Sequence, residues 1–517
     1  MSTHKSIAKS ASIIGLGTFV SRLLGFARDV VIARLFGVYT YAQAFVIAFR
    51  IPNLFRDLVG EGASNAAIVP VFSEYSVKRS KEEFWELANV VLNLLLVILS
   101  GITILGIIFS PILVRLIAPG FISDPFKLEA TIQLNRIIFP YILLIGLAAY
   151  STALLNSLKH FSVPAFAPAL LNISIIVCAV IFGEGITGLA SGVLIGGILQ
   201  LAVQVPVLYK KGFRLNLFKG FKHPAAITIG KLMVPRVASS CIYQLNNFVD
   251  SIFGSLAFIV GEGGVAVLYF SYRLVQFPIG IFGNSLSQAI LPAFSAQAAE
   301  GNHEQLKKTL SFGLRAILFV MLPASAAFMT LAAPLIRTIF EGGKFDAYST
   351  RLTAEVLFYY SIGLAAYAST KILQSCFFAL KDTITPAKIS AFNLVMNIVL
   401  ISALIFPLKI GGIALANSIS GIASAALLYR LLKKQLKLSI GKEISISLIK
   451  ILAASFCMGL VCYFIDKNVI SGSGLVAKAL YLTTLFLSGI ISYLVFCFVF
   501  GVRELHELRA WLFKKAL

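Results

Sequence analysis

Long stretches without a single charged side chain dominate this sequence. Each is about as long as a bilayer crossing, which takes roughly 20 residues. The stretches free of Asp, Glu, Lys and Arg cover residues 87–114, 137–158, 161–183, 185–209, 274–299, 316–336, 389–408, 410–429 and 479–502. In a bilayer the backbone must satisfy its own hydrogen bonds, so such stretches form helices. Hydrophobic residues make up 58% of the chain and charged residues 13%, which leaves too little polar surface for a large soluble domain. We therefore predict an all-α integral membrane protein.

Five further stretches read as spans that carry one or more charges. They cover residues 10–36, 40–60, 230–258, 352–380 and 444–466, which brings the predicted total to 14 transmembrane helices. The clusters of Lys and Arg lie at the amino terminus, in the loops after even-numbered spans and in the tail. The positive-inside rule then places both termini in the cytoplasm of a multi-pass protein. This rule also explains the net charge of +22, so we expect no nucleic-acid partner.

The sequence repeats itself at an offset near 222 residues. Residues 67–73 (Ala-Ile-Val-Pro-Val-Phe-Ser) match residues 289–295 (Ala-Ile-Leu-Pro-Ala-Phe-Ser), and Lys159 matches Lys381. Six spans in each repeat insert with the same orientation, as in several transporter folds. We predict two parallel six-helix lobes and two extra carboxy-terminal helices. The expected domains are an N-lobe of spans 1–6 (1–220), a C-lobe of spans 7–12 (221–438), spans 13–14 (439–502) and a cytoplasmic tail (503–517).

Several arginines fall inside the predicted spans, where each costs about 2.5–3.5 kcal/mol or more near the bilayer centre. Arg34, Arg50 and Arg236 are explained by span ends or by pairing with acids. The remaining arginines outnumber their acidic neighbours, Asp29 and Glu61. They are Arg22, Arg28, Arg56 and Arg273. A cavity with surplus positive charge favours an anion. Arginine suits phosphate because its planar fork donates two parallel hydrogen bonds and stays charged.

The second repeat differs in charge from the first. It places Asp250 where the first repeat has Arg28, and it adds Asn393 and Asn397, which share a helix face at i and i+4. These three residues could form a cation site, such as one for Na⁺. Alternatively, Asp250 is protonated or paired with an arginine. We expect no metal centre, no catalytic residue and no cofactor, with dependence on the membrane potential or Na⁺ left open.

The motifs around these arginines resemble a known family. Residues 21–29 (Ser-Arg-Leu-Leu-Gly-Phe-Ala-Arg-Asp), residues 50–56 (Arg-Ile-Pro-Asn-Leu-Phe-Arg) and residues 61–63 (Glu-Gly-Ala) are similar to the amino-terminal signature of the MurJ (MviN) family. Residues 272–278 (Tyr-Arg-Leu-Val-Gln-Phe-Pro) resemble its eighth span. The family comprises the lipid II flippases of the multidrug/oligosaccharidyl-lipid/polysaccharide exporter superfamily, and the resemblance covers the whole chain.

The resemblance implies a transporter for peptidoglycan and cell wall biogenesis in the bacterial cytoplasmic (inner) membrane. Its substrate would be lipid II, an undecaprenyl-pyrophosphate glycolipid, moved from the inner to the outer leaflet by alternating access. The substrate-binding residues carried over are Arg22, Arg28, Asp29, Arg56, Glu61 and Arg273. Spans 13 and 14 would line a groove for the lipid tail. We expect a monomer in contact with membrane lipids, with other cell-wall synthesis proteins as further partners.

Two acidic positions of the family are replaced here, by Gln43 and Gln276, so a coupling role for those carboxylates is in doubt. Two other transporters stay open as alternatives. A flippase for another polyprenyl-linked oligosaccharide would use the same chemistry. A drug or cation antiporter of the same superfamily would favour acidic residues in its cavity, which the arginine surplus argues against.

Overall fold

The computed structural model describes residues 3–55, 67–183, 185–217, 220–436, 441–468 and 474–505. Contacts divide the chain into two compact units. The first comprises Met1–Phe258, Glu262–Ala266 and Gly342–Phe345. The second comprises Ile259–Gly261, Val267–Glu341 and Asp346–Leu517.

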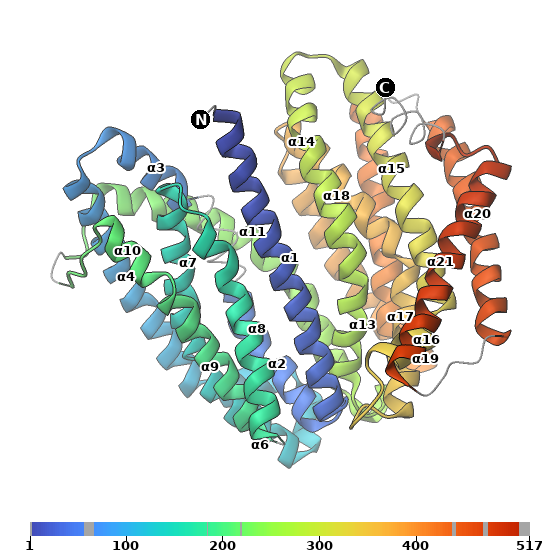
Figure 1. The fold of residues 1–517 in the computed structure, drawn as a ribbon, viewed down its shortest axis with the longest axis horizontal. Helices are drawn as coiled ribbons and strands as arrows, with labels where there is room; N and C mark the ends of the chain where they lie inside the picture. Colours follow the sequence, from blue (N-terminus) through green and yellow to red (C-terminus); the bar gives the residue numbers. More distant parts are fainter. Residues whose placement is uncertain are drawn as a thin grey trace. The chain divides into compact units, whose positions relative to one another are not determined.

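The described part of the chain is built from helices (Figure 1). The first unit contains α1 (Thr3–Phe36), α2 (Thr40–Phe55), α3 (Val69–Lys78), α4 (Lys81–Ile108), α5 (Ser110–Ile117), the 3-10 helix η2 (Pro119–Ser123), α6 (Pro125–Ile138), α7 (Tyr141–Ser157), α8 (Ser162–Phe182), α9 (Ile186–Ala202), α10 (Val205–Lys211) and α11 (Pro224–Gly254). The unit boundary falls within α12 (Ala257–Val260) and α13 (Gly264–Pro278). The second unit continues with the π-helical turn η3 (Ile279–Gly283), α14 (Asn284–Ala299), α15 (His303–Thr330), α16 (Ala332–Ile339), α17 (Ala347–Ile362), α18 (Leu364–Ala379), α19 (Ile384–Leu436), α20 (Gly441–Asn468) and α21 (Leu475–Val499).

Every predicted span overlaps one or more of these helices, which confirms the all-α membrane fold class. By length and composition, the described residues form nine helices that could cross a membrane, or ten if the bent pair α17 and α18 is one span. One 53-residue helix, α19, contains both predicted stretches 389–408 and 410–429. They are separated at Lys409, whose backbone is non-helical (φ 48°, ψ −128°). The total of 14 spans stays a prediction that is consistent with this arrangement.

The predicted duplication recurs in the helix boundaries. Helices α4 and α15 begin and end 222 residues apart, and so do α5 and α16. Their amino-terminal caps correspond as well. Ser80 accepts a hydrogen bond from the backbone of residue 83, and Asn302 accepts one from residue 305. Helix caps satisfy backbone N–H groups that have no partner within the helix. The equivalent helices α4 and α15 therefore begin with the same kind of side-chain cap.

A second pair of equivalent turns shows the duplication in the backbone itself. Lys159 follows α7 and Lys381 follows α18, and both adopt positive φ values, 58° and 61°. Non-glycine residues seldom adopt this conformation. In both turns the lysine N–H donates to the carbonyl three residues back. The matching lysines of the sequence therefore mark the same tight turn in each repeat, before α8 in one and before α19 in the other.

The two sequence repeats are interlocked at one end of the first unit. The Gly120 N–H of η2 donates to Ser255 Oγ just after α11 at 2.9 Å. The Lys344 N–H donates to the Arg34 carbonyl near the end of α1 at 2.8 Å. A Cβ on Gly120 would lie 2.0 Å from the Ser255 carbonyl oxygen, and one on Gly343 would lie 2.3 Å from that of Arg34. Glycine is needed at both contacts because a side chain would collide with the backbone of the other repeat.

Each unit contains one close helix packing that bears on the predicted binding residues or on the lipid-tail helices. In the first unit α1 lies alongside α8 (Figure 1), and a Cβ on Gly17 would lie 2.6 Å from the Ala165 carbonyl oxygen. In the second unit α20 packs against both α15 and α21, and Met458, Cys462 and Cys497 are buried in this cluster. Small residues permit such close approach of membrane helices, where dispersion contacts replace the hydrophobic effect.

Candidate substrate-binding site

Arg28 and Asp29 of α1 form a buried ion pair. Arg28 is 5% exposed and Asp29 is fully buried. The guanidinium donates to Asp29 Oδ1 twice, from Nε at 3.0 Å and from Nη2 at 2.7 Å. A buried charge needs a counter-charge and hydrogen-bond partners, since its desolvation costs several kcal/mol. The structure therefore brings these two predicted site residues together as a unit.

Asn172 of α8 is a further partner of the Arg28 guanidinium. Its Oδ1 accepts from Arg28 Nη1 at 3.1 Å, and its Nδ2 donates to the Ser21 carbonyl of α1 at 3.1 Å. The Arg28 guanidinium also lies 5.8 Å from the ring centroid of Phe49. Sequence reasoning missed Asn172, although an asparagine within the uncharged stretch 161–183 is a signal that could have been used. It fixes the orientation of the arginine fork.

The other predicted substrate-binding residues have different surroundings. Arg22 is exposed on α1. Arg273 is half-buried on α13, in the second unit. Arg56 and Glu61 lie outside the described residues. The predicted six-residue binding site is thus seen only at Arg28 and Asp29, and its assembly from both repeats stays a prediction.

Arg50 was predicted to lie at a span end or to pair with an acid, and the structure gives it two neutral hydrogen-bond acceptors on α11. Its Nη1 donates to the Asn247 carbonyl and to Ser251 Oγ. Ser251 is buried, and Arg50 is half-buried. This contact links span 2 of the first repeat to the first span of the second.

The three residues of the predicted cation site belong to different units. Asp250 is half-buried on α11 in the first unit, whereas Asn393 and Asn397 lie on α19 in the second. Asn393 Nδ2 donates to Ser424 Oγ at 2.8 Å, and Asn397 Nδ2 to Asn417 Oδ1 at 3.4 Å. Both asparagines therefore face the part of α19 that follows Lys409, and they share one helix face as their i, i+4 spacing predicts. A joint site with Asp250 stays a prediction.

The second unit contains an apolar groove of about 830 Å³. Its walls come from α15, α17, α18, α19 and α20, and include Leu314, Leu318, Leu373, Ile422, Leu448 and Leu452. Tyr429, Lys433 and Ser445 add polar groups to this lining. The predicted span 13, which is α20, supplies one wall. The predicted span 14, which is α21, packs on α15, where Tyr493 Oη donates to the Phe319 carbonyl at 2.7 Å.

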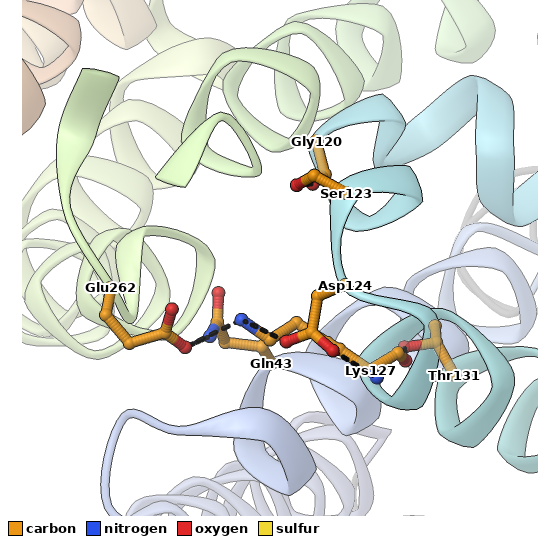
Figure 2. Close-up of polar contacts among 7 residues, drawn as sticks. All are labelled: Gln43, Gly120, Ser123, Asp124, Lys127, Thr131 and Glu262. Carbon is orange, nitrogen blue, oxygen red and sulfur yellow. Dashed lines mark hydrogen bonds and ion pairs between the residues drawn. The ribbon is translucent and has the colours of Figure 1, made fainter. Parts of the chain in front are cut away.

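A polar network at the start of α6 joins the two repeats (Figure 2). Lys127 is only 3% exposed, and its Nζ lies 2.6 Å from Glu262 Oε1 and 3.7 Å from Asp124 Oδ2. Buried Gln43 of α2 donates to the same Glu262 oxygen at 2.9 Å. The sequence around Lys127 does not indicate this partner, because pairing with a residue 135 positions away leaves no local signal. Gln43 thus stands beside a carboxylate supplied by another segment.

This network predicts unequal effects of removing its two charges. Glu262→Gln should lower the stability of the protein by about 1–3 kcal/mol, because it takes the nearest carboxylate from a buried ammonium group. Lys127→Met should cost less, because the Glu262 side chain is 41% exposed and can turn to water. Thermal unfolding of the purified variants measures the difference. A lower midpoint for Lys127→Met than for Glu262→Gln would contradict this order.

Comparison with known proteins places these features in a family. The family model described as lipid II flippase MurJ matches residues 32–483. A probable lipid II flippase MurJ of Buchnera aphidicola subsp. Acyrthosiphon pisum is 36% identical over 470 residues, which cover 90% of this chain and 91% of the relative. A probable lipid II flippase MurJ of Vibrio cholerae is 32% identical and aligns over 99% of both chains.

A solved structure agrees with the sequence relatives. Lipid II flippase MurJ in an inward closed conformation superposes with a TM-score of 0.79 and 28% identity, covering 95% of this chain and 99% of the other. The resemblance seen in the arginine motifs is therefore confirmed along nearly the whole length. The chain belongs to the MurJ family of lipid II flippases, which are multi-pass membrane transporters and not enzymes.

Proposed function

We propose that this protein moves lipid II from the inner to the outer leaflet of the bacterial cytoplasmic membrane by alternating access. The observation that carries the proposal is the apolar groove with Lys433 in its lining, in a chain that also buries an arginine fork. A long isoprenoid tail fits an apolar groove, and a pyrophosphate is the kind of anion that an arginine fork binds. The predicted topology puts Lys433 at the cytoplasmic side, where lipid II is available.

In the binding step, the pyrophosphate would compete with Asp29 for the Arg28 guanidinium. Without substrate, its carboxylate neutralises Arg28. An arriving pyrophosphate oxygen would compete with Asp29 Oδ1 for the Nε and Nη2 protons of Arg28. The guanidinium then keeps an anionic partner, whereas the displaced Asp29 carboxylate, which is buried, has to turn to another hydrogen-bond donor. Asn172 holds the fork in place during the exchange. We propose that Arg22, Arg56, Glu61 and Arg273 complete the site.

The network at Lys127 bears on the conformational step. By the predicted topology it lies at the outer face, and it joins α2 and α6 of the first repeat to Glu262 of the second. Outward opening would have to separate these groups.

An inside-negative potential of 100 mV would contribute about 2.3 kcal/mol for each negative charge moved outward. Arginines that move with the headgroup would oppose this contribution.

A depletion rescue tests the proposed function. The native lipid II flippase of a bacterium is removed, this chain is expressed, and the lipid II in the outer leaflet is measured. Export restored to near the native level supports the proposal. If the inserted protein gives no export in cells or in liposomes of defined lipids, lipid II is not its substrate, and the same liposomes then test another polyprenyl-linked oligosaccharide.

We also propose that Na⁺ binding at Asp250, Asn393 and Asn397 assists the return of the empty protein. Transport in liposomes should then be faster with a Na⁺ gradient, and Asp250→Asn should remove this acceleration while any response to membrane potential persists. Initial rates with Na⁺ and with choline as the cation measure the effect. Equal rates in both salts for the unchanged chain would rule out the Na⁺ site.

A further inference from the structure

A buried ion pair ties the segment after α21 to α15 and α20, two neighbouring helices that both line the groove. Glu504 is 7% exposed and Arg315 of α15 is 8% exposed. Arg315 Nη1 lies 3.0 Å from Glu504 Oε1. Ser447 of α20 donates from Oγ to the same oxygen at 2.5 Å. One carboxylate oxygen therefore contacts α15 and α20 together.

The chain reverses sharply to bring Glu504 into this position. Gly501 has a positive φ of 59°, a conformation that favours glycine. The Val502 N–H donates to the Cys497 carbonyl at 2.9 Å, and Lys450 Nζ of α20 donates to the Gly501 carbonyl at 3.0 Å. The turn after α21 is thus closed by its own backbone hydrogen bond and held against α20 by the Lys450 side chain. Glu504 is directed between the two helices by a defined turn.

The helical neighbours of Arg315 and Ser447 line the groove. Leu314 and Leu318 belong to its α15 wall, and Ser445 and Leu448 to its α20 wall. A change in the distance between Arg315 and Ser447 would therefore change the shape of the groove lining. The charge-free stretches place Arg315 just before span 9 and Glu504 just after span 14, both at the predicted cytoplasmic side, as is Lys433.

A buried ion pair is poor evidence for stability alone, because desolvation offsets much of its attraction. Ion pairs and hydrogen bonds do, however, fix geometry, since their strength falls when donor and acceptor separate. Elsewhere α15 and α20 meet through apolar side chains such as Ala326 and Met458. The Arg315–Glu504–Ser447 cluster adds directional contacts near the start of α20.

We propose that Glu504 is a positioning residue for the lipid-tail groove: by joining Arg315 and Ser447 it sets the separation of α15 and α20 where a polyprenyl chain enters. The proposal rests on the proposed function, because it assigns the groove to the tail of the transported lipid. In this assignment Glu504 acts on the tail and not on the headgroup. Its removal should therefore affect lipids according to the length of the tail.

Transport of two lipids with the same pyrophosphate headgroup tests this inference. One lipid carries the undecaprenyl tail and the other a tail of four isoprene units. In liposomes, Glu504→Gln should lower the initial transport rate of the long-tailed lipid at least tenfold and that of the short-tailed lipid less than twofold. The exchange of both charges, Arg315→Glu with Glu504→Arg, should restore at least half of the long-tail rate. Equal losses for both lipids, or no loss for either, would overturn the proposal.

Glu304→Gln is the matched control. Glu304 lies on the same helix, α15, and pairs with Lys307 at 2.7 Å, but its side chain is 77% exposed. This variant should transport both lipids as the unchanged chain does. A loss equal to that of Glu504→Gln would show that any broken ion pair on α15 has the same effect.

A distance measurement keeps the inference testable if transport fails. Spin labels are placed at the exposed positions Phe312 of α15 and Ile449 of α20, in a chain whose native cysteines are replaced. Glu504→Gln should broaden or shift the distance distribution, and the charge exchange should narrow it again. An unchanged distribution refutes the positioning role. If the unchanged chain transports neither lipid, the proposed function fails, while the label distances still decide whether Glu504 sets the helix separation.

Discussion

Replacing Arg28 with alanine should abolish lipid II export while the protein still inserts into the membrane. The variant loses the fork that would hold the pyrophosphate. Two charge-assisted hydrogen bonds are worth about 1.5–3 kcal/mol each. At about 1.4 kcal/mol for a factor of ten, their loss would weaken binding at least about a hundredfold. The depletion rescue measures growth and outer-leaflet lipid II, and membrane fractionation measures insertion.

Two further variants make this result specific. Arg28→Lys keeps the charge but not the planar fork, so it should restore export only in part. Arg79→Ala removes an arginine whose side chain is 57% exposed and pairs with Glu83 on the surface, so it should export normally. Normal growth of the Arg28→Ala strain without any other flippase would exclude Arg28 from the binding site.

Filling the groove should stop transport by excluding the lipid tail, whereas the Arg28 variant loses binding of the headgroup. Ala366→Trp with Ala426→Trp introduces two large side chains into the lining, at positions that are half-buried and exposed. Membrane lipid is as apolar as the groove, so the tail gains little affinity from entering it. The loss should therefore appear in the transport rate and not in the affinity for the pyrophosphate headgroup. Transport of undecaprenyl lipid and binding of a tail-free headgroup measure the two effects separately.

An alanine outside the groove serves as the control for added bulk. Ala479 is exposed on α21, which supplies none of the described lining residues. Ala479→Trp should transport normally. If the doubly filled groove transports undecaprenyl lipid at the unchanged rate, the tail travels elsewhere.

The family of this protein could be recognised from its first 75 residues, but the partners of its key arginine could not. Arg28 stands out because a charge in an apolar stretch needs compensation. Asp29 is its neighbour in sequence, whereas Asn172 follows 144 positions later on α8. Nothing local in the sequence relates the two, since their contact depends on α1 packing closely against α8 through Gly17 and Ala165.

The groove was expected only because the chain resembles a family in which spans 13 and 14 line one. The composition of these helices indicates that they are apolar but does not indicate which residues they contact. The structure shows an apolar groove whose described lining includes residues of α15 and α20 but none of α21, and it shows that Glu504 links α15 and α20. That this groove holds the lipid tail stays a proposal. The sequence predicted a tail from residue 503 onward without a role for its first residues.

The sequence by itself determined the membrane class, the positions of the helices and the duplication, because these follow from local properties. A stretch of apolar residues must form a helix in a bilayer, and a repeated sequence repeats its caps and turns, as Lys159 and Lys381 show. Only the tertiary structure decided which charges meet. Lys127 with Glu262 and Arg315 with Glu504 pair over 135 and 189 positions. Such pairs form because burial leaves each charge without water, and the packing of distant helices determines which partner replaces it.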